Sequence, residues 1–204
     1  MIFNVGHAGQ MADLYQRPID GSGDGAVLVH SDRVKHALSW SRDGFVLFNV
    51  VGKGVELWAV PVKEPKNAVP LLQGGSNYVN ARFSPDGRWV AYASNESSRP
   101  EVYVKSFSQG RLGDGSRVSL NGGDRPRWGR DGRLYYIGLD NKLITMKLAL
   151  GTAVQAGAPM ELFPAPSPEW EPSPDGKRFL FLVPQQQRPT PPTMVLNWQA
   201  ALKK

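Results

Sequence analysis

Six polar residues occupy two fixed positions in three successive segments of this sequence, and their side chains are of the kinds that bind anions or one another. They are Asn80, Arg82, Arg125, Arg127, Glu169 and Glu171. The flat guanidinium group of arginine forms paired hydrogen bonds with carboxylates and phosphates, and a neighbouring glutamate can take the same place. We therefore predict either a site for a small anionic ligand or an internal network of ion pairs, and structural ion pairs are the commoner case.

No arrangement typical of a catalytic or metal-binding site accompanies these six residues. The sequence has no cysteine and no Gly-x-Ser-x-Gly motif, and its histidines lack the spacing of a zinc site. Residues 20–24 resemble the first half of a calcium loop, but Ser31 stands where the bidentate glutamate is required. The glycines of residues 21–25 precede a strand-like run, not the helix that a dinucleotide site needs. We predict a protein that is not an enzyme, with no metal and no cofactor.

The six residues belong to a repeat that is marked by an Asp-Gly pair. Its four copies, spaced by 43, 45 and 44 residues, are Asp43 with Gly44, Asp86 with Gly87, Asp131 with Gly132, and Asp175 with Gly176. In the two Ser-Pro-Asp-Gly copies, proline fixes φ, aspartate bonds its own backbone and glycine accepts a positive φ. We predict that these residues have a structural role, as tight turns between antiparallel strands.

Short runs of aromatic and β-branched residues follow each turn, at 45–48, 89–92, 134–137 and 179–182. Runs of this type predict strands, and a period near 44 residues is that of a four-stranded propeller blade. The sequence therefore predicts an all-β fold, a β-propeller of four-stranded antiparallel blades in one region over residues 1–204. About five blades are expected, at about 1–31, 36–73, 79–120, 124–165 and 169–198, with the first and last incomplete.

The first strand of each blade must position the six polar residues, because the innermost strands line the channel of a propeller. Strand residues alternate between faces, so the residues four and six before each aspartate should share one channel wall. The residues four before are Ser39, Arg82, Arg127 and Glu171, and those six before are Ala37, Asn80, Arg125 and Glu169. The residues three before each aspartate should point the opposite way, between blades; they are Trp40, Phe83, Trp128 and Pro172. We also expect an outer strand at 116–120 and a third strand of the last blade at 194–198.

The net charge of the chain does not by itself indicate a class of partner. Its net charge is +6, but the lysines and arginines are dispersed, which is typical of a solvated surface. We therefore expect no nucleic-acid partner, although a basic strand pair with aromatic residues keeps that alternative open: Arg125, Arg127, Trp128, Arg130, Arg133 and Tyr135. No apolar stretch is long enough to span a membrane, and no signal peptide is visible.

The repeats resemble those of TolB-like, WD-repeat-related propellers of bacteria, and most closely the C-terminal propeller region of acidobacterial-type serine/threonine protein kinases. The resemblance rests on Ala-Arg-Phe-Ser-Pro-Asp-Gly-Arg-Trp-Val-Ala-Tyr-Ala-Ser-Asn-Glu-Ser at 81–97, Asp-Arg-Pro-Arg-Trp at 124–128 and Val-Leu-Asn-Trp at 195–198. It implies a sensory or protein-binding part outside the cytoplasm, in the periplasm or beyond. The kinase domain and membrane helix of such proteins are not in this sequence, so kinase activity is not implied and N-terminal parent domains are expected to be missing.

These observations predict a non-catalytic binding or scaffold module of a bacterial kinase-like or envelope protein. Its partner would be a protein or a small anionic ligand. The alternative is an exported propeller enzyme of hydrolase or lyase type, with its site at the channel mouth. The two differ in that the enzyme requires convergent catalytic groups at that mouth, for which the sequence has no motif.

Overall fold

The structure is a computed structural model that describes residues 1–5 and 13–184. These residues form 18 strands and a single short 3-10 helix, η1 (Pro65–Asn67). The first two sheets contain β1 (Ile2–Val5), β2 (Asp13–Gln16) and β3 (Ala26–Val29), then β4 (Lys35–Trp40), β5 (Phe45–Val51), β6 (Val55–Pro61) and β7 (Val69–Leu72). The third sheet contains β8 (Tyr78–Phe83), β9 (Trp89–Ser94), β10 (Glu101–Ser108) and β11 (Arg111–Arg117). The last two contain β12 (Asp124–Trp128), β13 (Arg133–Ile137), β14 (Lys142–Leu150), β15 (Val154–Ala156) and β16 (Met160–Pro164), then β17 (Trp170–Pro172) and β18 (Phe179–Phe181).

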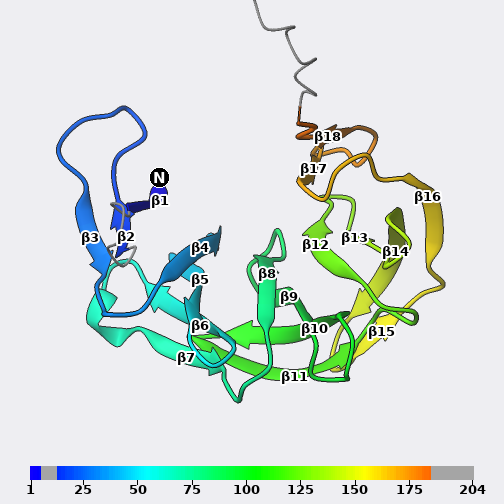
Figure 1. The fold of residues 1–204 in the computed structure, drawn as a ribbon, viewed down its shortest axis with the longest axis horizontal. Helices are drawn as coiled ribbons and strands as arrows, with labels where there is room; N and C mark the ends of the chain where they lie inside the picture. The colour runs from blue at the N-terminus through cyan, green and yellow to red at the C-terminus, as the bar shows by residue number, and fades with distance from the viewer. Residues whose placement is uncertain (6–12, 185–204) are drawn as a thin grey trace, which may run out of the picture.

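The five sheets follow one another around an arc, in chain order (Figure 1). Within each sheet, strands that are neighbours along the chain pair antiparallel, except that β16 joins β14 beside β15. The strands β4, β8, β12 and β17 lie on the inner side of the arc, and the later strands of each sheet lie outward (Figure 1). This confirms the predicted all-β class and blade-like sheets.

Two outer strands differ from the sequence-based expectation. The outer strand of the third sheet is β11, not 116–120, because a turn at Gln109 and Gly110, both with positive φ, reverses the chain directly after β10. In the fourth sheet the nine-residue β14 is long enough to pair with the unpredicted β15 at its end and with β16 at its start. The strand predicted at 194–198 lies outside the described residues.

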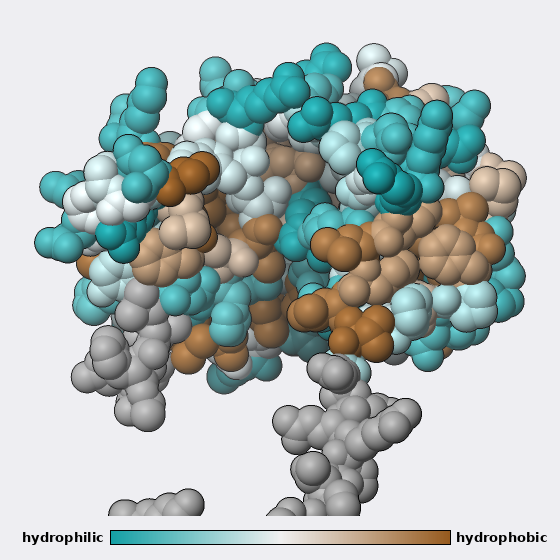
Figure 2. Space-filling view, turned by 90° about the horizontal axis from the view of Figure 1, so that it is seen from above, coloured by the Kyte–Doolittle hydropathy of each residue, from teal (hydrophilic) through white to brown (hydrophobic). Residues whose placement is uncertain are grey.

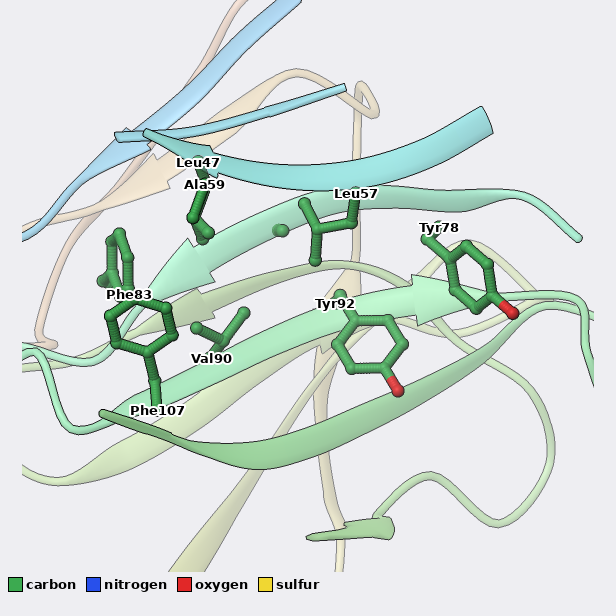
Figure 3. Packing of buried hydrophobic residues seen from close by; sticks show 9 residues of the cluster. Leu47, Leu57, Ala59, Tyr78, Phe83, Val90, Tyr92 and Phe107 are labelled. Carbon is green, nitrogen blue, oxygen red and sulfur yellow. The ribbon is translucent and has the colours of Figure 1, made fainter. Parts of the chain in front are cut away.

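An apolar cluster fills each interface between consecutive sheets. On β5, Val46, Phe48 and Val50 pack toward the first sheet, while Leu47 packs toward the third. Leu47 belongs to the cluster shown in Figure 3, in which Tyr92 of β9 also lies. Both faces of each inner sheet are therefore buried, which explains why β5, β9 and β13 read as continuous apolar runs.

The Asp-Gly pairs form the predicted turns. The four glycines have φ between 66° and 84°, a region that side chains other than glycine's rarely adopt. In the turn after β8, the Ser84 hydroxyl lies 2.6 Å from Asp86 Oδ1, which also accepts a hydrogen bond from the Arg88 backbone N–H at 3.2 Å. The turn glycine Gly87 lies beside Ser41 and Asp43 of the preceding turn. The turns thus stack along one rim of the arc.

Seen from the open side of the arc, hydrophilic side chains gather along one rim and in the hollow between the two ends (Figure 2). Hydrophobic side chains gather over the ends themselves (Figure 2). The largest exposed apolar side chains of the C-terminal end are Leu180 and Leu182, at 75% and 72%. The six polar residues of interest lie on the inner strands or, for Glu169, directly before β17.

Candidate functional site

The first strands of consecutive sheets contact one another along the inner side of the arc. Their hydrogen bonds join residues that are 44 positions apart in the sequence, close to the length of one blade. The Phe83 backbone N–H donates to the Ser39 hydroxyl at 3.1 Å, and Arg82 Nη1 donates to the Leu38 carbonyl at 2.7 Å. Residues of these predicted channel strands therefore join neighbouring blades.

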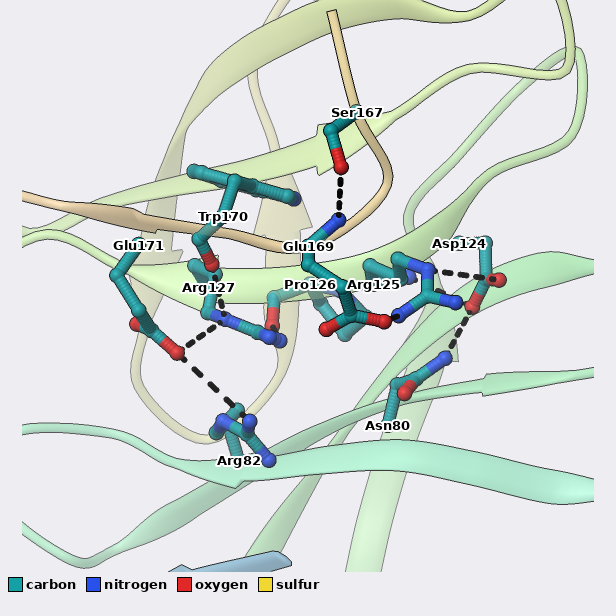
Figure 4. Close-up of polar contacts among 10 residues, drawn as sticks. All are labelled: Asn80, Arg82, Asp124, Arg125, Pro126, Arg127, Ser167, Glu169, Trp170 and Glu171. Atoms are coloured by element: carbon teal, nitrogen blue, oxygen red, sulfur yellow. Dashed lines mark hydrogen bonds and ion pairs between the residues drawn. The ribbon is translucent and has the colours of Figure 1, made fainter. Parts of the chain in front are cut away.

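Arg82, Arg127 and Glu171 form one cluster, from three different sheets (Figure 4). Arg127 Nε donates to Glu171 Oε1 at 2.8 Å and to the Trp170 carbonyl at 3.2 Å. Arg82 Nη2 lies 3.8 Å from the same glutamate oxygen. The Arg127 guanidinium also lies 5.7 Å from the centre of the Trp170 ring, a favourable cation–π distance. One carboxylate is thus shared by two arginines.

The cluster carries a net positive charge. Burial and the nearby charge of Arg127 lower the pKa of Arg82 to about 10, against the opposing effect of Glu171. Arg82 therefore keeps its proton at neutral pH, and two cations face one anion. The Arg127 side chain is 6% exposed, whereas that of Glu171 is 59% exposed, so the anion is the movable partner of the group.

The residues six before each aspartate form a second cluster instead of sharing this one. Asn80 Nδ2 donates to Asp124 Oδ1 at 2.8 Å, and Arg125 Nη1 donates to Glu169 Oε1 at 2.6 Å (Figure 4). Asn80 and Arg125 have positive φ, 56° and 52°, within register shifts of β8 and β12. Such bulges interrupt the regular alternation of a strand, so alternation alone does not place these side chains, and the prediction of one shared wall stays a prediction.

A pocket of about 300 Å³ opens beside Arg82, Arg127 and Glu171. Two further lining residues, Arg42 and Arg130, are exposed and form no ion pair with any described residue. Sequence reasoning missed Arg42 and named Arg130 only in the nucleic-acid alternative. Both stand directly before the aspartate of an Asp-Gly turn, where the other two copies have proline. That substitution within the repeat is the signal that could have identified them.

Two tryptophans complete the pocket. Trp128 donates its indole N–H to the Arg82 carbonyl at 3.1 Å. Trp40 was expected to point between blades, but it is 45% exposed and lines the pocket. Phe83, at the same position of β8, is buried as expected. The pocket therefore combines four arginines, one glutamate and three aromatic side chains, those of Trp40, Phe83 and Trp128.

The described residues contain no group of three or more side chains suited to a metal ion. No helix in that part of the chain is long and apolar enough to cross a membrane. The predictions of no metal and no cofactor stay predictions. The arrangement of the pocket is one for binding through charge and stacking.

Comparison with known proteins decides the fold. No family model matches the chain. A protein described as a TolB from Agrobacterium tumefaciens superposes on 89% of this chain and 70% of its own, with a TM-score of 0.63 and 14% identity. TolB from Acinetobacter baumannii superposes on 91% of this chain and 46% of its own, with a TM-score of 0.66 and 16% identity. The chain has a TolB-like β-propeller fold.

The sequence likeness to TolB has about the length of one blade. The Tol-Pal system protein TolB of Pseudomonas aeruginosa is 46% identical over 43 residues, which are 21% of this chain and 10% of that protein. The TolB-like fold also resembles part of a puromycin-hydrolysing peptidase of Mycobacterium tuberculosis, over 31% of that chain at a TM-score of 0.59 and 19% identity. These likenesses show the TolB-like propeller itself, while the association with kinases rests on the sequence resemblance alone.

Proposed function

We propose that this TolB-like propeller is a non-catalytic binding module whose channel mouth recognises an anionic group of a protein or small ligand. The observation that supports the proposal most is the shared carboxylate of Glu171, held between Arg127 at 2.8 Å and Arg82 at 3.8 Å. An internal carboxylate at this place has the geometry that a ligand carboxylate would adopt. Because Glu171 is more than half exposed, a ligand can displace it at small cost.

The remaining pocket residues supply the other requirements of a binding site. Arg42 and Arg130 are exposed, and each can donate to an incoming anion. Trp40 offers an exposed ring against which an apolar or planar part of the ligand can pack. Hydrogen bonds to charged groups contribute about 1.5–3 kcal/mol each, so two or three of them give binding at millimolar strength or better.

The test is a calorimetric titration with succinate, inorganic phosphate and a short peptide that ends in a free carboxylate. Arg130→Gln should weaken binding about tenfold without loss of stability, because the side chain is exposed and forms no ion pair with a described residue. Arg111→Gln, an exposed arginine on β11 outside the pocket, is the matched control. Failure of every anion to bind wild type, or equal weakening by the control, would refute the site.

We further infer that the module is the sensory or protein-interaction part of a bacterial kinase-like or envelope protein. Support comes from the resemblance at 81–97, 124–128 and 195–198 and from the TolB-like fold. Translation of the coding region upstream of Met1 tests this inference. An in-frame kinase domain and membrane helix would support it, and an unrelated upstream gene with its own stop codon would contradict it.

A further inference from the structure

A second pocket lies between the first and second blades. It has a volume of about 650 Å³ and is lined by β3 and the segment after it, β5, Trp58 of β6, and the η1 segment. In Figure 1, β3 is the outermost strand of the first sheet, and η1 contacts it. Leu28 of β3 and Phe48 of β5 belong to the apolar cluster between the two sheets and also line the groove. It shares no residue with the channel mouth.

The floor of this groove is apolar and its size is that of a small-molecule site. Phe48 and Val50 are 1% and 5% exposed, and their side chains belong to the buried cluster between the two sheets. Val27, on the outer wall, is 50% exposed, so apolar surface continues from the floor to solvent. Pockets of 300–1,000 Å³ that combine an apolar lining with a few polar groups are the usual form of ligand sites.

The ionisable groups at the groove are all basic side chains. They are His30, Arg33, Lys35 and Lys66, and no aspartate or glutamate lines it. Three of the four already have partners outside the lining: Asp13 lies 2.7 Å from His30 and 3.3 Å from Lys35, and Glu56 pairs with Arg33 at 2.8 Å.

Lys66 differs from these three. It is exposed on η1 and forms no ion pair within the described part of the chain. Its charge is the one that a bound anion would meet. A ligand suited to this groove therefore has an apolar body and one anionic end.

We propose that this groove binds an amphipathic carboxylate of the medium-chain fatty-acid class. The acyl chain would lie along Phe48, Val50 and Trp58, and the carboxylate would pair with Lys66. This assignment does not depend on the channel-mouth proposal. It makes a chemical prediction of its own, because affinity should rise with chain length and should depend on the charge of a single lysine.

The test is titration calorimetry of the whole chain with octanoate, decanoate and dodecanoate below their micelle concentrations, and with decanol as the uncharged probe. Each added methylene should strengthen binding by about fourfold, hence about 16-fold for each step of two carbons, with one carboxylate bound per chain. Lys66→Gln should weaken decanoate about tenfold and leave decanol unchanged. Lys63→Gln removes an exposed lysine of the same segment that does not line the groove, so it should change neither.

A second variant tests the apolar wall. Val27→Glu places a negative charge at a half-exposed position and should abolish decanoate binding while the melting temperature stays near that of wild type. The proposal is overturned if wild type shows no saturable binding of decanoate or dodecanoate. It is equally overturned if affinity does not depend on chain length, or if Lys66→Gln and Lys63→Gln behave alike.

Discussion

Replacement of Glu171 with glutamine should separate the two roles of the channel mouth, because it removes one negative charge and keeps the shape of the side chain. The hydrogen bond from Arg127 Nε, 2.8 Å long in wild type, would then have a neutral acceptor. Hydrogen bonds to charged groups contribute about 1.5–3 kcal/mol and neutral ones about 0.5–1.5 kcal/mol. Since Glu171 is 59% exposed, solvent screens part of the difference, and we expect a loss of stability of about 1 kcal/mol.

Anion affinity should change in the opposite direction. Arg82 and Arg127 would lose their shared carboxylate, and one pair of unit charges at 4 Å is worth about 4 kcal/mol at an effective dielectric constant of 20. Exposure of Glu171 reduces this value severalfold. We expect the affinity for succinate or phosphate to rise about tenfold, which is about 1.4 kcal/mol. A purely structural ion pair would show the stability loss without the gain in affinity.

The assay is urea unfolding of each variant together with calorimetric titration at low and high salt. Glu161→Gln is the matched control, because Glu161 is 61% exposed and pairs at 2.7 Å with Lys142, and neither residue lines the channel-mouth pocket. It should lower stability by a similar amount and leave anion affinity unchanged. Unchanged or weaker anion binding in Glu171→Gln, or an equal gain in the control, would refute the assignment of the site to Arg82 and Arg127.

Three further changes test the fold around the site. Hydrogen bonds from Arg33 lower the pKa of Glu56 from 4.5 to about 2. The free energy of unfolding of wild type should therefore fall by up to about 3 kcal/mol as pH falls from 4.5 to 2. Glu56→Gln should flatten this dependence in unfolding measured across that range. Gly87→Val should cost about 1–3 kcal/mol by thermal denaturation, because φ at this residue is 76°, whereas Lys105→Ala should cost much less. The buried hydroxyl of Tyr92 has no hydrogen-bond partner among the described residues, so Tyr92→Phe should leave stability equal or raise it by about 1 kcal/mol; a loss above 1 kcal/mol would contradict this.

What the sequence predicts well here is local. The Asp-Gly turns and the hairpins they close depend on the φ of one glycine and on hydrogen bonds within four or five residues, as at Asp86 and Gly87. The repeat then fixes the number and order of most strands. The outer strand β11 was misplaced because the turn at Gln109 uses a left-handed residue that is not glycine, which composition does not reveal.

The candidate site was only partly predictable, because it depends on how neighbouring sheets are placed. Arg82, Arg127 and Glu171 were identified from their shared repeat position, and the structure brings them together. Asn80 and Arg125 instead hydrogen-bond to Asp124 and Glu169, at positive-φ positions within register shifts. Neither residue is a glycine, so the sequence does not signal these shifts. The pocket also brings Trp40, Arg42 and Arg130 together from two blades, which no single repeat could show.

Structural and ligand-binding roles of the channel arginines are compatible, because each guanidinium group has more donors than the fold uses. Arginine carries five N–H donors. Arg82 uses Nη1 alone in hydrogen bonds among the described residues, to the carbonyls of Leu38 and Ala81, and its Nη2 stays 3.8 Å from Glu171. The hydrogen bond to the Leu38 carbonyl in the neighbouring blade fixes the Arg82 guanidinium group and occupies only one of its nitrogens. The fixed orientation that results reduces the entropy lost when Nε and Nη2 meet an anion, so the same contact that joins two blades prepares the arginine for a ligand.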